Sequence, residues 1–252
     1  MRLTFLGTGT STGVPTLACD CRVCRSSDPR DKRTRPSVLL EYDRRVIVID
    51  TTPDFRQQAL RAQMRRLDAV LFTHDHADHI LGLDDVRVFY FRQKVPIPIY
   101  ADGRTMQSIR RVYKYIFDES YAYGGVAKLD PQLIDGPFDL WGERLIPVPV
   151  LHGDLPVLGF RCGAAAYVTD FSAIPDATLP LLEGLDVLIL DALRHKPHPT
   201  HSSVEQSLRL VERLKPERAF FTHIAHELGH EETNRALPPS VRLAYDGLAL
   251  DL

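Results

Sequence analysis

Three histidines and two aspartates fall within six consecutive residues of the stretch Thr73–His79. Four of them, His74, His76, Asp78 and His79, form the pattern HxHxDH. Neutral imidazole and carboxylate groups are the ligands that suit zinc, manganese or iron. The spacing lets the first two histidines face one cation while Asp78 and His79 turn to a second. The stretch therefore predicts a metal site, and a polar loop with chance histidines is the alternative.

The elements around this stretch favour the metal site. The apolar run Ala69–Thr73 directly precedes the first ligand and predicts a strand, so the ligands lie on a loop at its tip. Many of the apolar runs are continuous, as in strands buried on both faces. Strands are predicted at Leu3–Leu6, Ser37–Tyr42, Val46–Asp50, Ala69–Thr73, Ile97–Tyr100, Val148–Leu151, Leu158–Cys162, Ala166–Thr169, Val187–Asp191 and Arg218–Thr222.

Helical periodicity lies between these strands. Pro53–Met64 begins with a proline, a residue favoured in the first turn. Arg104–Phe117 places Met106, Ile109, Val112, Tyr113 and Ile116 on one stripe, and Ser202–Leu214 has Ser202 or Ser203 as its N-cap. Strands in two halves with helices interspersed predict an α/β (α+β) layered fold.

The composition is that of a globular protein. The 252 residues are 44% hydrophobic and 25% charged, and the formal net charge is −2. Such a balance excludes a global basic field that would attract nucleic acid or a membrane. No apolar run approaches the roughly 18 residues that span a bilayer, and Met1–Gly7 lacks the pattern of a signal peptide. We therefore expect a cytoplasmic protein with no membrane partner.

The motif and its surroundings resemble the metallo-β-lactamase superfamily over essentially the whole chain. This resemblance implies one domain over residues 1–252, an αββα four-layer sandwich, and an active site with two divalent metals, zinc or manganese. It implies that Asp50 orders the metal loop, that His152 completes the first metal site, that Asp170 bridges both metals, and that His223 completes the second site. Each of these residues ends a predicted strand, as a site on a rigid rim requires.

A second metal site is predicted near residues 19–24. Cys19, Cys21 and Cys24 form CxCxxC, and three thiolates need one more ligand to close a tetrahedral structural zinc. If His223 faces the active site, His226 can reach the cysteines. Three reduced cysteines in a flexible loop are the alternative. Cys162 lies on an apolar strand and is expected to be buried.

The cysteine loop narrows the resemblance to the branch that contains the cyclic phosphodiesterase of the carbon–phosphorus lyase pathway, which opens phosphoribosyl 1,2-cyclic phosphate. The similarity includes Gly7–Thr10, the cysteine loop, Thr73–His79, Thr222–His226 and Asp246–Gly247. It implies hydrolysis of a cyclic or other small phosphodiester by a hydroxide that bridges the metals. The segment near 84–137 is harder to match and is expected to be an insertion, loop-rich from Asp118.

The leaving oxygen of such a reaction needs a proton. His201 is our candidate for the acid, because the resemblance implies a histidine at this position in contact with the substrate phosphate. Asp78 is the other residue expected to take part in catalysis. His195 and His198 are weaker candidates for the acid, and His230 is expected to be exposed. Incidental imidazoles on a solvated loop are the alternative.

Three other functions remain open. A tRNA 3′-end-processing nuclease shares the metal motif, although the balanced charge argues against a nucleic-acid partner. The pyrroloquinoline quinone biosynthesis protein B, a carrier or oxidative protein, has a similar cysteine loop. A non-catalytic binding protein would be expected to lose a ligand. The tyrosines Tyr113, Tyr115, Tyr121 and Tyr123 could serve a homodimer face or a substrate wall, and ordinary packing is preferred.

Overall fold

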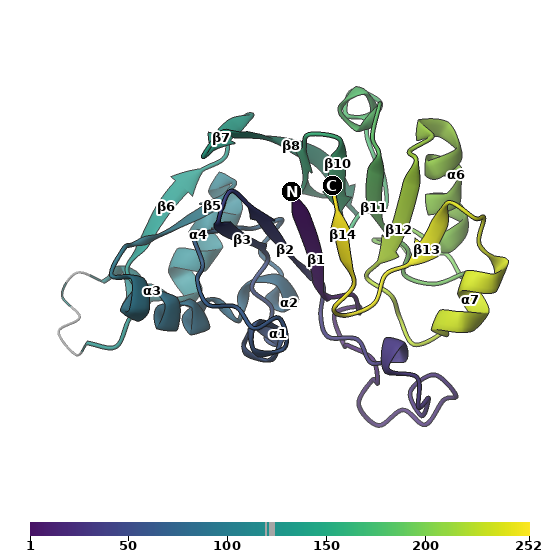
Figure 1. Cartoon of the computed structure of the whole chain (residues 1–252), viewed down its shortest axis with the longest axis horizontal. Coiled ribbons are helices and arrows are strands. Elements are labelled where there is room, and N and C mark those ends of the chain that lie inside the picture. Colours follow the sequence, from purple (N-terminus) through teal and green to yellow (C-terminus); the bar gives the residue numbers. More distant parts are fainter. Residues whose placement is uncertain (119, 121–123) are drawn as a thin grey trace. The chain divides into compact units, whose positions relative to one another are not determined.

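The computed structural model describes residues 1–118, 120 and 124–252, and the chain divides into two compact units (Figure 1). The first unit comprises Met1–Leu6, Ser37–Asp135 and Ala249–Asp251, and the second comprises Gly7–Pro36 and Gly136–Leu248 with Leu252. Each unit contains one seven-stranded sheet and its own helices. Among the described residues, no helix combines the length and the apolar character needed to cross a bilayer.

The sheet of the first unit joins the two ends of the chain, because β1 pairs with β14 in antiparallel orientation (Figure 1). Strands β2 and β3 form an antiparallel hairpin, and β3, β4, β5 and β6 then run parallel to one another. Parallel strands bring their carboxyl ends to one edge of a sheet. In spatial order the strands are β14 (Ala249–Asp251), β1 (Arg2–Gly7), β2 (Ser37–Tyr42), β3 (Arg45–Ile49), β4 (Ala69–Leu71), β5 (Ile97–Ala101) and β6 (Leu129–Leu133).

Short helices cover this sheet and bury one apolar cluster against it. Val48, Val70 and Ile99 of the sheet meet Phe55 of α1 and Ile109 of α4 in this cluster. Burying side chains of this size contributes about 1.5–3 kcal/mol each. The helices are α1 (Phe55–Arg61), α2 (Ala77–Ile80), α3 (Arg87–Gln93), α4 (Gly103–Val112) and α5 (Lys114–Phe117), with the 3₁₀-helix η2 (Leu83–Val86).

The helix predicted over residues 104–117 is divided in the structure. It breaks at Tyr113, where α4 ends and α5 begins, and the Tyr113 hydroxyl donates a 2.9 Å hydrogen bond to the carbonyl of Ile80. Val112, expected on the buried stripe, is 45% exposed. Because the tyrosine is anchored to another element, its tertiary contact overrides the local helical periodicity.

The sheet of the second unit has a similar division of strand directions. Strands β7, β8, β9 and β10 are antiparallel neighbours, whereas β10, β11, β12 and β13 are parallel. The carboxyl ends of β8, β10, β11 and β12 therefore lie at the same edge. In spatial order the strands are β13 (Val241–Leu243), β12 (Arg218–Thr222), β11 (Val187–Asp191), β10 (Ala165–Val168), β9 (Leu155–Cys162), β8 (Glu143–His152) and β7 (Phe138–Leu140).

The helix predicted over Ser202–Leu214 forms in the second unit as α6. Ser203 is its N-cap and forms a capping box with Gln206, which settles the choice between Ser202 and Ser203. Val204 and Val211 of α6 join an apolar cluster with Leu188 and Leu190 of β11. The helices are α6 (Val204–Leu214) and α7 (His230–Ala236), with the 3₁₀-helices η1 (Pro29–Asp31) and η3 (Leu179–Leu182).

The segment 84–137, expected to be an insertion, contributes β5 and β6 to the first sheet. Within its part from Asp118 onward, expected to be loop-rich, β6 forms as an edge strand, where Pro131 is tolerated. Packing explains two of the tyrosines, since Tyr113 is buried and the Tyr115 hydroxyl donates to Asp84. Tyr121 and Tyr123 lie outside the described residues.

Candidate metal sites

The HxHxDH residues of the first unit gather where β4 ends. His74 follows β4 closely, His76 is the N-cap of α2, and α2 itself carries Asp78 and His79. The ring of His74 lies with its centroid 4.6 Å from that of His76 and 4.1 Å from that of His79. An Asp78 carboxylate oxygen is 3.4 Å from Nε2 of His79. The structure thus brings these predicted ligands together within one unit.

Asp75, inside the same motif, binds side chains of a neighbouring helix. Its carboxylate accepts a 2.6 Å hydrogen bond from Ser108 and lies 3.4 Å from the Arg104 guanidinium, and both partners belong to α4. Asp75 therefore anchors the metal loop to the neighbouring helix.

Asp50 contacts Thr73 and His79, at the two ends of the stretch that carries the HxHxDH residues. It is fully buried and accepts hydrogen bonds from the Thr73 amide and hydroxyl, both at 2.8 Å, and from Nδ1 of His79 at 2.7 Å. Burial raises the pKa of Asp50, whereas His79 and Thr73 oppose the rise. A bond at Nδ1 fixes the tautomer of His79 and leaves Nε2 as the nitrogen that can bind a cation.

The loop behind the motif requires a glycine at one position. A Cβ atom at Gly82 would lie 2.0 Å from the carbonyl oxygen of Thr52, so no larger residue fits without a shift of the backbone. The Gly82 amide donates 2.9 Å to the carbonyl of Thr51. This close approach fixes the end of α2 against the turn that follows Asp50.

In the second unit, His152, Asp170 and His223 lie at the shared edge of the sheet. His152 is the last residue of β8, and its Nδ1 donates a 2.6 Å hydrogen bond to the carbonyl of Thr200. Oδ1 of Asp170 lies 3.1 Å from Nε2 of His223. Both are buried, and the Asp170 carboxylate also accepts a 2.7 Å hydrogen bond from Thr169. Because His152 is held through Nδ1, its Nε2 remains the atom suited to a metal.

Three residues at strand ends adopt left-handed backbone angles. Asp50, Asp170 and His223 have φ values of +66°, +52° and +57°. Such angles are uncommon for residues other than glycine, although Asp and His tolerate them better than most. Strained backbone persists where the surrounding structure holds it, and it concentrates at functional sites. Each bend turns a carboxylate or imidazole away from the strand direction.

His201 is held by a buried carboxylate that sequence reasoning missed. Nδ1 of His201 donates to Oδ2 of Asp191 at 2.7 Å, and the Asp191 side chain is wholly buried. Burial raises the pKa of Asp191, whereas His223 and His201 oppose the rise. The ring of His201 stacks on that of His223 at 4.5 Å and 19°. The position of Asp191 at the end of a predicted strand beside other ligand-bearing ends is the signal that could have found it.

The other histidines of the second unit differ from His201. His195 is exposed and pairs with Glu205 at 2.8 Å. Burial and the neighbouring His201 lower the pKa of His198, which disfavours a protonated ring there. The expectation that His230 is exposed is wrong, because it is 4% exposed and burial beside Arg33 lowers its pKa to about 4.

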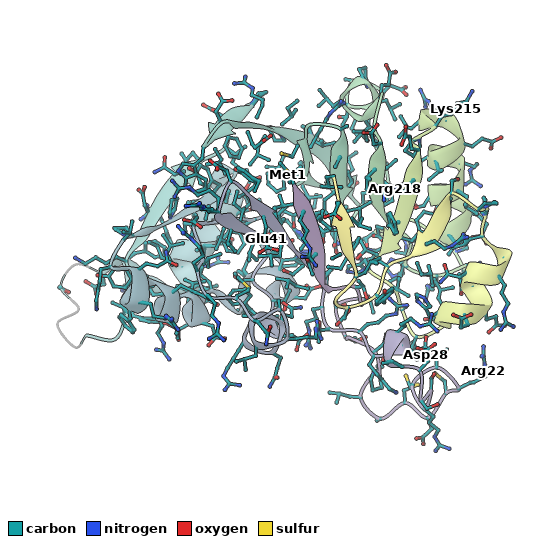
Figure 2. The ribbon with its side chains drawn as sticks, in the orientation of Figure 1. Met1, Arg22, Asp28, Glu41, Lys215 and Arg218 are labelled. Carbon is teal, nitrogen blue, oxygen red and sulfur yellow. The ribbon has the colours of Figure 1, made fainter. Side chains whose placement is uncertain are left out.

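The four residues predicted to hold structural zinc lie together in the second unit. Nδ1 of His226 is 3.1 Å from the sulfur of Cys19, 3.4 Å from Cys21 and 3.5 Å from Cys24. The amide of Cys24 lowers the pKa of Cys21 to about 6, whereas burial raises the pKa of Cys24 to about 11. Cys162 is buried elsewhere, as expected. Figure 2 shows the N-terminal segment that carries the cluster, with Arg22 and Asp28 labelled.

The donor sets fit divalent cations. The candidate ligand atoms of His152, Asp170 and His201 all lie within 4.8 Å of one another, and so do those of Asp191, His201 and His223. Oδ1 of Asp191 is buried and has no hydrogen-bond donor among the described residues. Buried carboxylates and imidazoles at this density are costly unless a positive charge compensates them. Three thiolates with one imidazole match a closed zinc site.

Comparisons with known proteins agree with this chemistry. The family model described as "Beta-lactamase superfamily domain" matches residues 45–224. A crystal structure described as a new diphosphatase from the PhnP family is 51% identical, covers 100% of this chain and 97% of its own, and has a TM-score of 0.94. The Zn²⁺-bound PqqB of Methylobacterium extorquens covers both chains fully at 21% identity and a TM-score of 0.81, which supports the fold alone.

A curated relative is longer than this chain. An octanoyltransferase of Porphyromonas gingivalis (strain ATCC BAA-308 / W83) is 40% identical over an alignment 252 residues long, which covers 98% of this chain and 51% of that protein. The chain thus spans about half the length of this relative. The predicted α/β (α+β) metallo-β-lactamase fold is confirmed, since the chain has two mixed sheets with helices and its structural neighbours share this fold. The chain belongs to the metallo-β-lactamase superfamily, in its PhnP-like branch.

Proposed function

We propose that the protein hydrolyses a phosphorus–oxygen bond in a small molecule, either a phosphodiester, such as a cyclic one, or a diphosphate. The observation that carries this proposal is the Asp191–His201 pair. A mostly buried imidazole, held at 2.7 Å by a buried carboxylate, lies against His223 and His152. This is the arrangement that a positioned acid beside a metal centre requires.

The protein would hold two divalent cations, zinc or manganese. We assign the role of ligands to His74, His76, Asp78, His79, His152, Asp170 and His223. Bound cations of this kind lower the pKa of water to near neutrality and offset the charge of phosphate oxygens. Asp50 and Thr200 keep their histidine partners in one tautomer.

The residues of the second unit then supply the proton. As water attacks, its oxygen bonds to phosphorus, the proton that it loses passes to solvent, and the bond to the leaving oxygen breaks. His201 gives its Nε2 proton to that leaving oxygen, and Asp191 holds Nδ1 and stabilises the positive ring before the transfer. His198, with its lowered pKa, is less suited to this task.

We further propose that Cys19, Cys21, Cys24 and His226 hold one structural zinc. The lowered pKa of Cys21 supports a thiolate, the form that binds metal. The site would fix the segment before residue 36 to the chain that follows β12.

The names of the relatives define the alternatives to be tested. A diphosphatase is the description of the 51% identical structure. Octanoyl transfer is stated for a protein about twice as long as this chain. The functions of the pyrroloquinoline quinone proteins, which this chain resembles, and of the tRNA nucleases, which share the metal motif, are two further alternatives.

The test is hydrolysis by metal-loaded protein of bis(p-nitrophenyl) phosphate, a ribose cyclic phosphodiester and a nucleoside diphosphate ester. We expect turnover that a chelator abolishes, and a loss of about a hundredfold or more in His201→Ala, because general acids contribute 10²–10⁴-fold. His195→Ala is the matched control and should retain turnover, since His195 pairs only with the exposed Glu205 among the partners recorded for it.

Two results would contradict the proposal. His201→Ala within about threefold of the parent at unchanged metal content would remove His201 from the reaction. The proposed function would be wrong if the protein transferred octanoyl groups from a thioester, or cleaved precursor tRNA, and had no activity on the three phosphate compounds.

A further inference from the structure

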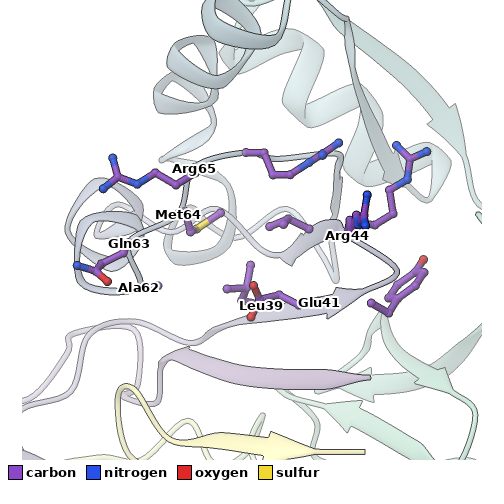
Figure 3. Close-up of a pocket in the computed structure, with 11 residues that line it drawn as sticks. Leu39, Glu41, Arg44, Ala62, Gln63, Met64 and Arg65 are labelled. Carbon is purple, nitrogen blue, oxygen red and sulfur yellow. The ribbon is translucent and has the colours of Figure 1, made fainter.

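A basic pocket opens in the first unit, outside the metal-binding residues. It has a volume of about 540 Å³, within the range of small-molecule sites (Figure 3). Four arginines line it, Arg44, Arg45, Arg65 and Arg66, together with the acid Glu41. The remaining lining includes the apolar side chains of Leu39, Val46, Ala62 and Met64. The pocket therefore combines cationic groups with an apolar wall.

One buried carboxylate positions two of these arginines. The Asp68 side chain is 5% exposed, and it accepts from Nε of Arg66 at 2.8 Å and from the Arg45 guanidinium at 3.2 Å. It also accepts from the Val46 amide at 2.9 Å. Because Asp68 holds the guanidiniums of Arg45 and Arg66 in place, they are ordered before a ligand arrives, and less entropy is lost on binding.

The other two arginines have no acidic partner among the described residues. Arg44 and Arg65 are exposed and take part in no recorded salt bridge. With Asp68 and Glu41 each offsetting one arginine, the pocket retains a surplus of two positive charges. A phosphate monoester carries a charge of about −1.5 to −2 near neutral pH, which matches that surplus.

The backbone at the rim of the pocket is held in uncommon conformations. Asp43 and Arg44, at the turn between β2 and β3, have φ values of +43° and +61°, and Gln63 after α1 has +52°. Two-residue hairpin turns of this kind usually contain glycine. Figure 3 shows Arg44 and Gln63 on opposite sides of the pocket.

The pocket lies at the other end of the strands from the metal ligands. Arg45 begins β3, and Arg66 and Asp68 come just before β4, whereas Asp50 and His74 follow the ends of these parallel strands. A five-residue strand separates its ends by roughly 15 Å at about 3.3 Å per residue. A ligand in this pocket would therefore lie away from Asp50 and His74 of the same unit.

We propose that this pocket is a second binding site, for a phosphate monoester with an apolar organic group. The phosphate is bound by the guanidinium of Arg44 with those ordered by Asp68, and Arg65 adds positive charge on the other side of the pocket (Figure 3). The organic group lies against Leu39, Val46 and Met64. Arginine binds phosphate through paired, charge-assisted hydrogen bonds. The proposal does not depend on the proposed hydrolytic function.

Calorimetric titration of the metal-loaded protein with phenyl phosphate tests this site. The variant Arg44→Gln/Arg65→Gln removes both unpartnered cations, and Arg111→Gln/Arg235→Gln removes the same charge from exposed positions elsewhere. We expect the parent and the control to bind one phenyl phosphate per chain at this site with the same Kd. In the pocket variant this Kd should rise at least tenfold. Inorganic phosphate should bind this site several-fold more weakly, because it lacks apolar contacts.

Each result bears on the proposal. Identical isotherms for the parent, the control and the pocket variant would overturn the site. Equal affinity for inorganic phosphate would overturn the organic part of the ligand. Phenyl phosphate that binds at the proposed metal centre would depend on the metals and not on the arginines. If the hydrolytic function is wrong, this metal-dependent binding is missing in all three proteins while the arginine-dependent binding remains, so the two failures are distinguishable.

Discussion

Asp50 shows how a residue can be critical to a metal centre without being one of its proposed ligands. Both carboxylate oxygens act only as acceptors, one from the Thr73 amide and the other from the Thr73 hydroxyl and His79. Its side chain is fully buried, and Nδ1 of His79 lies 2.7 Å from one of its oxygens. Its contribution to the site is the orientation of His79 and of the loop that begins at Thr73.

The substitution Asp50→Asn tests this role. An amide group presents one NH₂, which would meet either the Thr73 amide or the Nδ1–H of His79, so one donor would face another donor. We expect metal affinity to fall 10- to 100-fold, as is typical when a group that orients a ligand is lost. Competition with a chelating dye measures this affinity. Asp54→Asn, in the same turn of the chain, is the control, and an equal loss in both variants would contradict a specific role for Asp50.

At the residue scale, the types and spacing of side chains predicted much of the candidate site. The HxHxDH pattern predicts residues that lie together in the first unit, and the cysteine pattern predicts residues that lie together in the second. The left-handed backbone of Asp170 and His223 could not be predicted, because nothing in the local sequence distinguishes these residues from ordinary turn residues. Asp191 was missed as the partner of His201 because the loop between them does not show in its sequence that it folds back onto the end of β11.

At the scale of elements, the start of α6 fixes the loop that carries His201. The Ser203 hydroxyl accepts from the Gln206 amide at 3.2 Å, and the Gln206 side chain accepts from the Ser203 amide at 2.8 Å. These bonds satisfy two amides at the helix start that would otherwise lack partners. Because His201 lies two residues before this cap, the position of the imidazole depends on where the helix begins.

Ser203→Ala is therefore expected to cost about 1 kcal/mol of unfolding free energy, the usual effect of losing an N-cap. For a chain of this size that corresponds to a fall in Tm of about 2–4 °C. Differential scanning calorimetry of metal-loaded protein measures it, with the exposed Ser240→Ala as the control. No difference between the two variants would show that the capping box contributes nothing to stability.

Sequence patterns predicted the elements that have a strong apolar signal. All of the predicted strands correspond to strands of the structure, because long apolar runs such as Val187–Asp191 are buried in the centre of a sheet. The missed strands lie at or next to the edges of their sheets: β7, β13 and β14 have three residues each, and β6 contains a proline. Short edge strands carry little periodicity of their own and form because a neighbour offers hydrogen bonds.

At the scale of the whole molecule, the segment before residue 36 is tied to the last third of the chain within the second unit. The buried Arg33 donates to the carbonyl of Ala244 at 2.6 Å and lies 3.2 Å from His230. Thr34 donates through its amide and hydroxyl to Asp246, at 2.8 and 2.7 Å. The cysteine cluster extends this set of long-range links, because its histidine comes from the loop after β12. A metal there would close a loop of about two hundred residues, which limits the freedom of the unfolded chain.

The substitution Cys21→Ala tests that link. We expect elemental analysis to find one zinc fewer per chain than in the parent, and Tm to fall, because a tetrahedral site with two thiolates and one imidazole is left open. Cys162→Ala removes a thiol that lies outside the cluster and should keep the parent's zinc content. Its own effect on Tm reports the loss of buried sulfur rather than of metal. If both variants retain the same zinc, the cysteines hold no metal, and the hydrogen bonds of Arg33 and Thr34 alone would secure the N-terminal segment.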